Sequence, residues 1–229
     1  MTLGIMQPYF MPYIGYWQLM AAVDTYVVYD DVNYIKGGWV SRNNILMNGK
    51  PYMFTITLNG ASPNKLFNEI TIRDDFRKFL RMLDYCYAHA PYHAEIMPLM
   101  EQICEYENRS LGEFMMNSFQ QVLNYLDIDT RLVLSSRIEK DNTLRGSEKV
   151  KHICHLLQAE TYLNAIGGQE LYDKADFKAA GIELRFLQTN TLTYPQQCEP
   201  FVPNLSIIDV LMHNGKERTQ RLLKEYTLI

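Results

Sequence analysis

The stretch that decides the fold is residues 3–30, LGIMQPYFMPYIGYWQLMAAVDTYVVYD. Residues 3–6 are a short apolar run bounded by a Gln-Pro pair, which predicts a buried strand. Residues 13–22 carry apolar side chains at helical spacing, and residues 25–30 are β-branched and aromatic, which predicts a helix and a second strand. Strand, helix and strand in this order form the unit of a parallel sheet.

The same alternation returns in the second half of the chain. The patterns there predict strands over 130–136, 161–166 and 182–188, and helices over 146–159, 169–180, 205–215 and 216–226. Between the two halves lie a hairpin around Asn48-Gly49 and a mainly helical stretch, 76–126. We therefore expect one α/β domain over 1–229. It is a Rossmann-like parallel sheet flanked by helices, with 76–126 as a helical insertion or subdomain.

Three serines stand where helices are expected to begin. Ser110 precedes Glu113 at the spacing of a capping box, in which the two side chains satisfy the first free N–H groups of the helix. Ser147 and Ser206 precede or open the helices predicted after them and are expected to be N-caps.

Composition narrows the class of protein. The 229 residues carry a net charge of -4, which disfavours a general nucleic-acid binder because such proteins usually present a basic surface. No stretch approaches the roughly 20 apolar residues of a membrane span, and the N-terminus lacks the pattern of a signal peptide. We therefore expect a cytoplasmic protein without a membrane span, whose four cysteines, none in a C-x-x-C pair, are reduced.

The loop after the first strand is the first candidate site. Open parallel sheets bind ligands at the carboxyl ends of their strands, which is where this loop leaves the sheet. A glycine in the following helix would let a ligand approach the free N–H groups of the first turn, which favour phosphate. The alternative is that the aromatic rings only cover the sheet. The candidate residues are Gln7, Tyr9, Tyr13, Gly15 and Tyr16.

The segment YDDVNYIKGGWVSRN is the second candidate site. Its two carboxylates end a strand and could orient an amine, accept a proton or bind a metal, and its cations suit a phosphorylated substrate. The alternative is a solvated loop with surface ion pairs. The candidate catalytic residues are Asp30, Asp31, Lys36 and Arg42, and the candidate binding residues are Trp39 and Asn43.

The second half of the chain contributes a third set of candidates. Ser147, if it is not only a cap, could hold a phosphate together with Arg145 and the helix N-terminus. A glycine pair after a strand suits either a tight turn or a close approach of backbone to ligand. The binding candidates here are Ser147, Gly167, Gly168, Tyr194 and Gln196. The histidine pairs His89/His93 and His152/His155 lack an identifiable third ligand, so no metal site is predicted.

The motifs IMQPYFMPYIGY, YVVYDDV and KGGWVSRN resemble the opening of the WbqC-like family of bacterial proteins. YLNAIGGQELYD and PNLSIIDVLMHNG resemble later motifs of that family, so the resemblance covers nearly the whole chain and is weakest in the helical middle. It implies a role in the synthesis of surface polysaccharide, such as the O-antigen of lipopolysaccharide, and of modified amino sugars. Y-I-G-Y also stands where nucleotidyl transferases and pantothenate synthetase carry H-x-G-H, but neutral tyrosine offers only an O–H donor.

These observations lead to an expected function with two alternatives. The first expectation is a transferase that acylates a nucleotide-linked amino sugar, as an N-acyl or aminoacyl transferase or as an amide ligase that uses ATP with Mg²⁺ through an acyl-adenylate. Asp30 or Asp31 would orient or deprotonate the amine, and Lys36 and Arg42 would stabilise developing negative charge. The alternatives are a non-catalytic carbohydrate- or nucleotide-sugar-binding protein and a metal-dependent hydrolase that uses the acidic pair.

Overall fold

The strand–helix–strand unit predicted at the N-terminus is present in the computed structural model, which describes residues 1–229. Strand β1 (Thr2–Met6) pairs in parallel with β2 (Thr25–Val28), and helix α1 (Ile14–Ala21) connects them. A parallel pair requires such a crossover, because the chain must return to the starting edge of the sheet. The loop of residues 7–13 therefore begins at the carboxyl end of β1.

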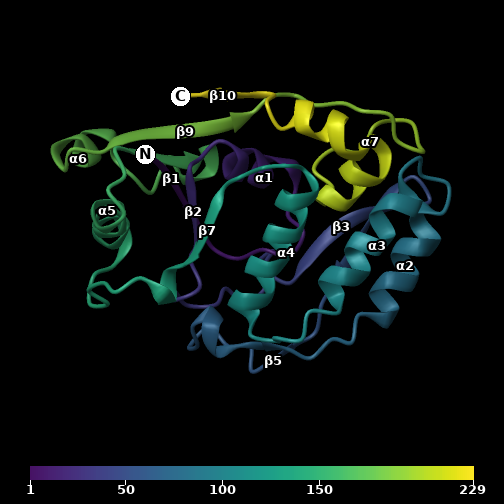
Figure 1. Cartoon of the computed structure of the whole chain (residues 1–229), viewed down its shortest axis with the longest axis horizontal. Coiled ribbons are helices and arrows are strands. Elements are labelled where there is room, and N and C mark those ends of the chain that lie inside the picture. The colour runs from purple at the N-terminus through teal and green to yellow at the C-terminus, as the bar shows by residue number, and fades with distance from the viewer.

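Six strands form the central sheet, in the order β10-β9-β8-β1-β2-β7 (Figure 1). The strands not yet introduced are β7 (Arg131–Leu134), β8 (Thr161–Ala165), β9 (Glu183–Thr189) and β10 (Tyr226–Leu228). Counted along the chain, this is the order 3-2-1-4-5-6 of doubly wound sheets, in which ligands bind where the strand order reverses. Here that switch point lies at the carboxyl ends of β1 and β8. The predicted α/β fold is confirmed, with a mixed and mostly parallel sheet.

The C-terminal end of the chain differs from the prediction. A helix was expected over 216–226, but helix α7 (Ile207–Leu222) ends earlier and β10 pairs antiparallel with β9. Gly215 interrupts α7 with a φ of 60°. This interruption coincides with the boundary expected between the helices over 205–215 and 216–226. The ring of Tyr92 occupies the space that a Cβ at this position would need, which explains the glycine.

Helices cover both faces of the sheet (Figure 1). On one face, Leu3, Ile5 and Val27 pack with residues of α5 (Gly146–Leu156) and α6 (Lys174–Ala179). On the other face, Tyr26 and Val28 join a larger core that α1, α7 and the central helices share. Neighbouring residues of one strand point to opposite faces, so the central strands are apolar on both sides, as expected for a parallel sheet.

The central segment is helical as predicted and packs against the loop that follows β1. It contains α2 (Arg77–Tyr87), α3 (His93–Cys104) and α4 (Leu111–Tyr125), and is preceded by the hairpin of β3 (Arg42–Met47) and β4 (Lys50–Thr55) and by the short pair β5 (Leu58–Asn59) and β6 (Thr71–Ile72). The Phe10 ring is fully buried and lies 5.6–6.2 Å, centroid to centroid, from the rings of Phe54, Phe76, Phe79 and Phe114. One hydrophobic core therefore spans the sheet and the helical segment.

Two of the three predicted caps are wrong in detail. Ser206 is the N-cap of α7, and its hydroxyl accepts a hydrogen bond from the N–H of Ile208 at 3.3 Å. Ser110 stands at the N-cap of α4 but makes no side-chain capping bond, and the Glu113 carboxylate pairs with Arg137. Ser147 lies inside the first turn of α5, whose N-cap is Arg145.

Candidate functional site

A cavity of about 520 Å³ lies at the switch point between β1 and β8. We call it the aromatic compartment. Residues after β1 form one wall, and residues after β8 form the other. The sequence-predicted residues that line it are Gln7, Tyr9, Tyr13, Tyr16, Trp39, Gly167 and Gly168. Segments far apart in the sequence thus meet at the carboxyl ends of the parallel strands, where sheets of this type bind ligands.

Tyrosine hydroxyls add polar groups to this mainly apolar cavity. The Tyr16 hydroxyl donates to the carbonyl oxygen of Gln7, and the rings of Tyr9 and Tyr16 meet edge to face at 5.9 Å between centroids. Burial raises the pKa of Tyr9, Tyr13 and Tyr16 above the usual value for tyrosine. All three hydroxyls are therefore neutral at physiological pH. Those of Tyr9 and Tyr13 can donate a hydrogen bond to a polar ligand, whereas the single proton of Tyr16 is used on Gln7.

The two glycines after β8 have different roles. A Cβ at Gly167 would meet no atom within 4 Å, so this position leaves space in the cavity. A Cβ at Gly168 would collide with the side chain of Asn164, so this glycine permits close packing within the protein. Asn164 also lines the aromatic compartment. No sequence pattern had marked it, because one asparagine near the end of a strand carries no signal by itself.

Gly15 does not face this cavity. A Cβ at Gly15 would lie 2.5 Å from the hydroxyl oxygen of Thr189 and 2.6 Å from the ring of Tyr13. The glycine therefore allows α1 to pack closely against β9, rather than allowing a ligand to approach the helix.

The predicted cations of the second segment lie outside the aromatic compartment. Lys36 is exposed. The Arg42 guanidinium donates to the Gly37 carbonyl and lies 5.5 Å from the centroid of the Trp39 ring, which is 49% exposed. Asn43 is buried and donates to the Met11 carbonyl at 2.5 Å. Of this group only Trp39 lines the cavity, while Arg42 supports its ring.

A second cavity, of about 470 Å³, lies beside the carboxyl ends of β2 and β7. We call it the basic compartment. Lys140, Arg145 and Lys149 line it together with a single carboxylate, that of Asp31, which leaves an excess of two positive charges. Tyr29 lines both compartments and connects them. The two lysines were not among the sequence-predicted residues.

Asp31 holds both lysines through one oxygen. Its Oδ2 lies 2.7 Å from Nζ of Lys140 and 3.1 Å from Nζ of Lys149, and its Oδ1 is buried without a hydrogen-bond partner. Burial acts to raise the pKa of Asp31, but the hydrogen bonds from Lys140 and Lys149 outweigh it and lower the pKa below its ordinary value. Asp31 is therefore ionised at neutral pH.

Asp30 lines neither compartment. Its Oδ1 accepts from the Ser136 N–H at 2.9 Å and its Oδ2 from the Ser136 hydroxyl at 2.6 Å. Burial raises the pKa of Asp30, against the effect of these hydrogen bonds. A Cβ at Gly112 would lie 2.9 Å from Cβ of Asp30, so α4 packs directly on this residue. Asp30 thus ties β2 to the segment after β7 and to α4.

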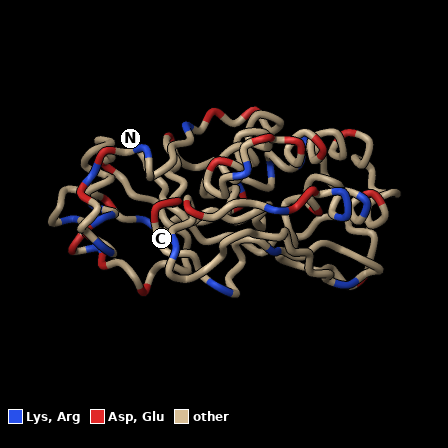
Figure 2. The backbone as a smooth tube through the Cα atoms, turned by 90° about the horizontal axis from the view of Figure 1, so that it is seen from below, with Lys and Arg blue, Asp and Glu red and all other residues tan.

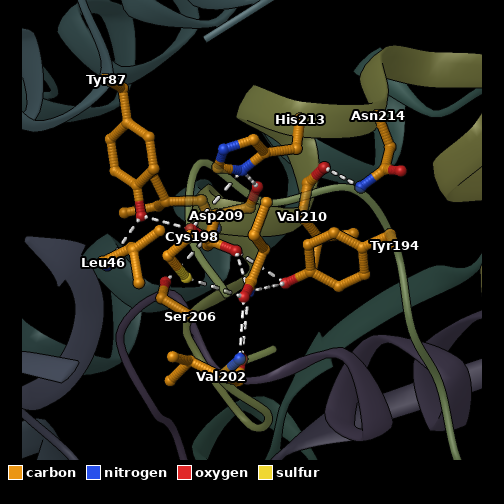
Figure 3. A network of polar contacts seen from close by, with 12 residues as sticks. Leu46, Tyr87, Tyr194, Cys198, Val202, Ser206, Asp209, Val210, His213 and Asn214 are labelled. Carbon is orange, nitrogen blue, oxygen red and sulfur yellow. Dashed lines mark hydrogen bonds and ion pairs between the residues drawn. The ribbon is translucent and has the colours of Figure 1, made fainter. Parts of the chain in front are cut away.

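Tyr194 belongs to a third group, buried around Asp209 on α7 (Figure 3). The half-buried Gln196 also contacts Asp209. The Asp209 Oδ2 accepts from the Tyr194 hydroxyl at 2.7 Å and from Nε2 of Gln196 at 2.9 Å. Its Oδ1 accepts from the Tyr87 hydroxyl at 2.9 Å. These contacts attach the loop before α7 to the helix. Ser147 is half-buried and, like Tyr194 and Gln196, lines neither compartment.

Three further observations concern the charge distribution, the helices and possible metal ligands. Lys and Arg are interspersed with Asp and Glu along the backbone (Figure 2). None of the helices combines the length and apolar character needed to cross a bilayer. No group of three or more His, Cys, Asp or Glu side chains is arranged as metal ligands.

Comparison with known proteins shows which relative and which family the chain resembles. The uncharacterized protein Rv1507c of Mycobacterium tuberculosis is 26% identical over 219 residues, which span 93% of this chain and 94% of that protein. No solved structure matches the chain. The model of the WbqC-like protein family matches residues 7–221, a range that includes both compartments. The chain therefore belongs to the WbqC-like protein family.

Proposed function

We propose that the protein acylates the amino group of a nucleotide-linked sugar in the synthesis of surface polysaccharide. The observation that carries this proposal is the tyrosine-lined aromatic compartment at the switch point of the sheet. Membership of the WbqC-like family supports the polysaccharide context, since the resemblance of the motifs implied it. The reaction is inferred from the chemistry that the site offers.

The aromatic compartment suits the sugar. Its volume of about 520 Å³ falls within the range of small-molecule sites. Aromatic rings pack on the apolar faces of a sugar ring, while tyrosine hydroxyls bond its polar edge. Tyr9, Tyr13 and Trp39 supply rings on one side of the cavity, and Gly167 leaves room on the other.

Acylation requires a defined set of bond changes. The sugar amine nitrogen bonds to the acyl carbon, the bond from that carbon to the phosphate oxygen of an acyl-adenylate breaks so that AMP leaves with the electron pair, and the proton of the amine passes to solvent water. Neutral tyrosine hydroxyls can donate to the oxyanion that develops on the acyl group. Asp31 is not assigned a step, because it lines the basic compartment and its Oδ2 contacts Lys140 and Lys149. Asp30 is not assigned a step, because Ser136 occupies its carboxylate.

Binding measurements test the first part of the proposal. We expect one member of a panel of uridine, thymidine, guanosine and cytidine nucleotide-linked amino sugars to raise the Tm of the full-length protein and to give a calorimetric Kd. Gly167→Leu should abolish that binding without lowering Tm, because its side chain would fill open space in the cavity. Trp39→Ala should weaken binding, whereas Tyr52→Ala should not, since Tyr52 is comparably exposed (45% against 49%) but lies on β4. Failure of the whole panel to bind would refute the proposal.

Turnover distinguishes this enzyme from a binding protein. The second candidate, a non-catalytic nucleotide-sugar-binding protein, is favoured by one observation: both carboxylates of the acidic pair are engaged by other protein groups. The bound sugar should be incubated with amino acids and acyl thioesters, with and without ATP and Mg²⁺. Mass spectrometry would detect the added acyl group. Tight binding without any acylated product would select the binding protein.

A further inference from the structure

We propose that the basic compartment is a diphosphate-binding site formed by Lys140, Lys149, Arg145 and the first turn of α5. The sequence predicted phosphate at two places, the loop after β1 and Ser147 with Arg145 at the start of the helix that became α5. The aromatic compartment, which the loop after β1 lines, contains no lysine or arginine. The neighbouring compartment contains three cations, so the anion is assigned to it.

The first argument is the unbalanced buried charge. The side chains of Lys140 and Lys149 are only 1% and 4% exposed, and both ammonium groups contact the same carboxylate oxygen of Asp31. One carboxylate neutralises one ammonium, and an unpaired charge removed from water is costly. A bound anion would supply the missing negative charge. Glu148, the acidic residue in the first turn of α5, pairs at 2.6 Å with Lys151 and does not supply it.

The second argument is the supply of hydrogen-bond donors. An ammonium group has three donors. Lys140 contributes charge but no free donor, because its ammonium group contacts oxygens of Asp31, Ser135 and Ile138. Lys149 uses two donors, on Oδ2 of Asp31 at 3.1 Å and on the Asp31 carbonyl at 3.3 Å, and keeps one for an anion. The eleven-residue helix α5 begins at Gly146, which lines the same cavity. The first N–H groups of a helix have no partners within it, and the helix dipole favours an anion there. Charged side chains and backbone donors thus converge on one space.

The third argument is the connection to the aromatic compartment. Nζ of Lys149 lies 5.2 Å from the centroid of the Tyr29 ring, and Tyr29 lines both cavities. A ligand with its sugar among the tyrosines would therefore pass Tyr29 and reach the lysines with its phosphates. The excess of two positive charges suits a diphosphate diester better than a neutral sugar. The placement of the sugar rests on the proposed function, but the anion site does not.

Titration of the full-length protein with inorganic pyrophosphate tests the anion site alone. We expect saturable binding that weakens as salt is raised. Arg145→Ala and Lys149→Met should each raise the Kd at least tenfold. Arg218→Ala, which removes an exposed arginine from α7 outside both compartments, should leave the Kd unchanged. Arg145 is exposed, so its replacement keeps the test valid if Lys149→Met fails to fold.

The outcomes separate the two proposals. Absence of pyrophosphate binding to the wild-type protein, or equal Kd values for the wild type and both compartment variants, would overturn the anion site. Gly167→Leu should retain pyrophosphate binding while it loses the nucleotide-linked sugar. Pyrophosphate binding in a protein that binds no nucleotide-linked sugar would support the anion site and refute the proposed function.

Discussion

Asp30 and Ser136 are joined by two hydrogen bonds, one from the amide of Ser136 and one from its hydroxyl. Residues more than 100 positions apart thereby connect the ends of two neighbouring strands, β2 and β7. This pairing makes a carboxylate that the sequence suggested for catalysis into a structural group. Its neighbour Asp31 instead lines the basic compartment.

Ser136→Ala should destabilise the protein. The substitution removes the hydroxyl that donates to a buried carboxylate, and hydrogen bonds to charged groups contribute about 1.5–3 kcal/mol. Urea denaturation would measure the loss. Ser147→Ala is the matched control, since Ser147 is half-buried and its hydroxyl caps no helix. Equal stability of the two variants would contradict the role given to the Asp30–Ser136 pair.

Gly112→Ala should lower the free energy of unfolding by about 1–3 kcal/mol, the usual range for overpacking. The added methyl group would lie 2.9 Å from Cβ of Asp30, closer than two carbons can approach without a shift of α4. The control is Gly167→Ala, where the methyl group meets nothing within 4 Å. Denaturant titrations of both variants check the contrast, and an unaffected Gly112→Ala protein would argue against this packing.

Tyr194→Phe should reduce stability and spare ligand binding. The substitution removes a donor from the buried Asp209 carboxylate, which is expected to cost about 1.5–3 kcal/mol. Tyr85→Phe should have no effect, because Tyr85 is 69% exposed. Melting curves and calorimetric titrations with the nucleotide-linked sugar would be compared. A change in Kd with an unchanged Tm would instead show that Tyr194 contacts the ligand, as the sequence predicted.

Asp31 should stabilise the protein in a pH-dependent manner. Its pKa is lower in the folded than in the unfolded state, so near that pKa the unfolded state binds more protons. The stabilising effect is complete above the unfolded pKa of about 3.9 and is lost as the pH falls toward the lower folded value. The difference in unfolding free energy between wild type and Asp31→Asn, measured from pH 6 to pH 3, should therefore shrink with acidification. A constant difference would show that Asp31 is not preferentially ionised in the folded state.

The sequence was sufficient to predict the parts of the molecule that depend on local patterns. The spacing of apolar residues located β1, α1 and β2. Because ligands bind at the carboxyl ends of parallel strands, Tyr9 and Gly167 were expected at the same edge of the sheet. The three-residue strand β10 was missed, because its pairing with β9 depends on a distant segment and leaves little local signal.

The remaining site residues depend on tertiary structure. Lys140 stands in a polar loop and Lys149 on a helix, where lysines are usually solvated, so only the fold reveals that both are buried beside Asp31. Tyr194 and Gln196 were predicted to bind the ligand because they lie in a proline-rich loop. The loop turns instead toward Asp209 on α7, a contact that no spacing in the sequence specifies.

The burial of Phe10 fixes one side of the aromatic compartment. Its ring lies among four phenylalanines of the hairpin and the helical segment, directly beside Tyr9 in the chain. Moving this wall outward would expose the fully buried Phe10 ring. The loss of its core packing would raise the free energy of the folded state. Any widening that admits substrate must therefore come from the opposite wall. There Leu171 is 71% exposed and has little packing to lose, so substrate entry and product release are expected to depend on that segment rather than on the tyrosines.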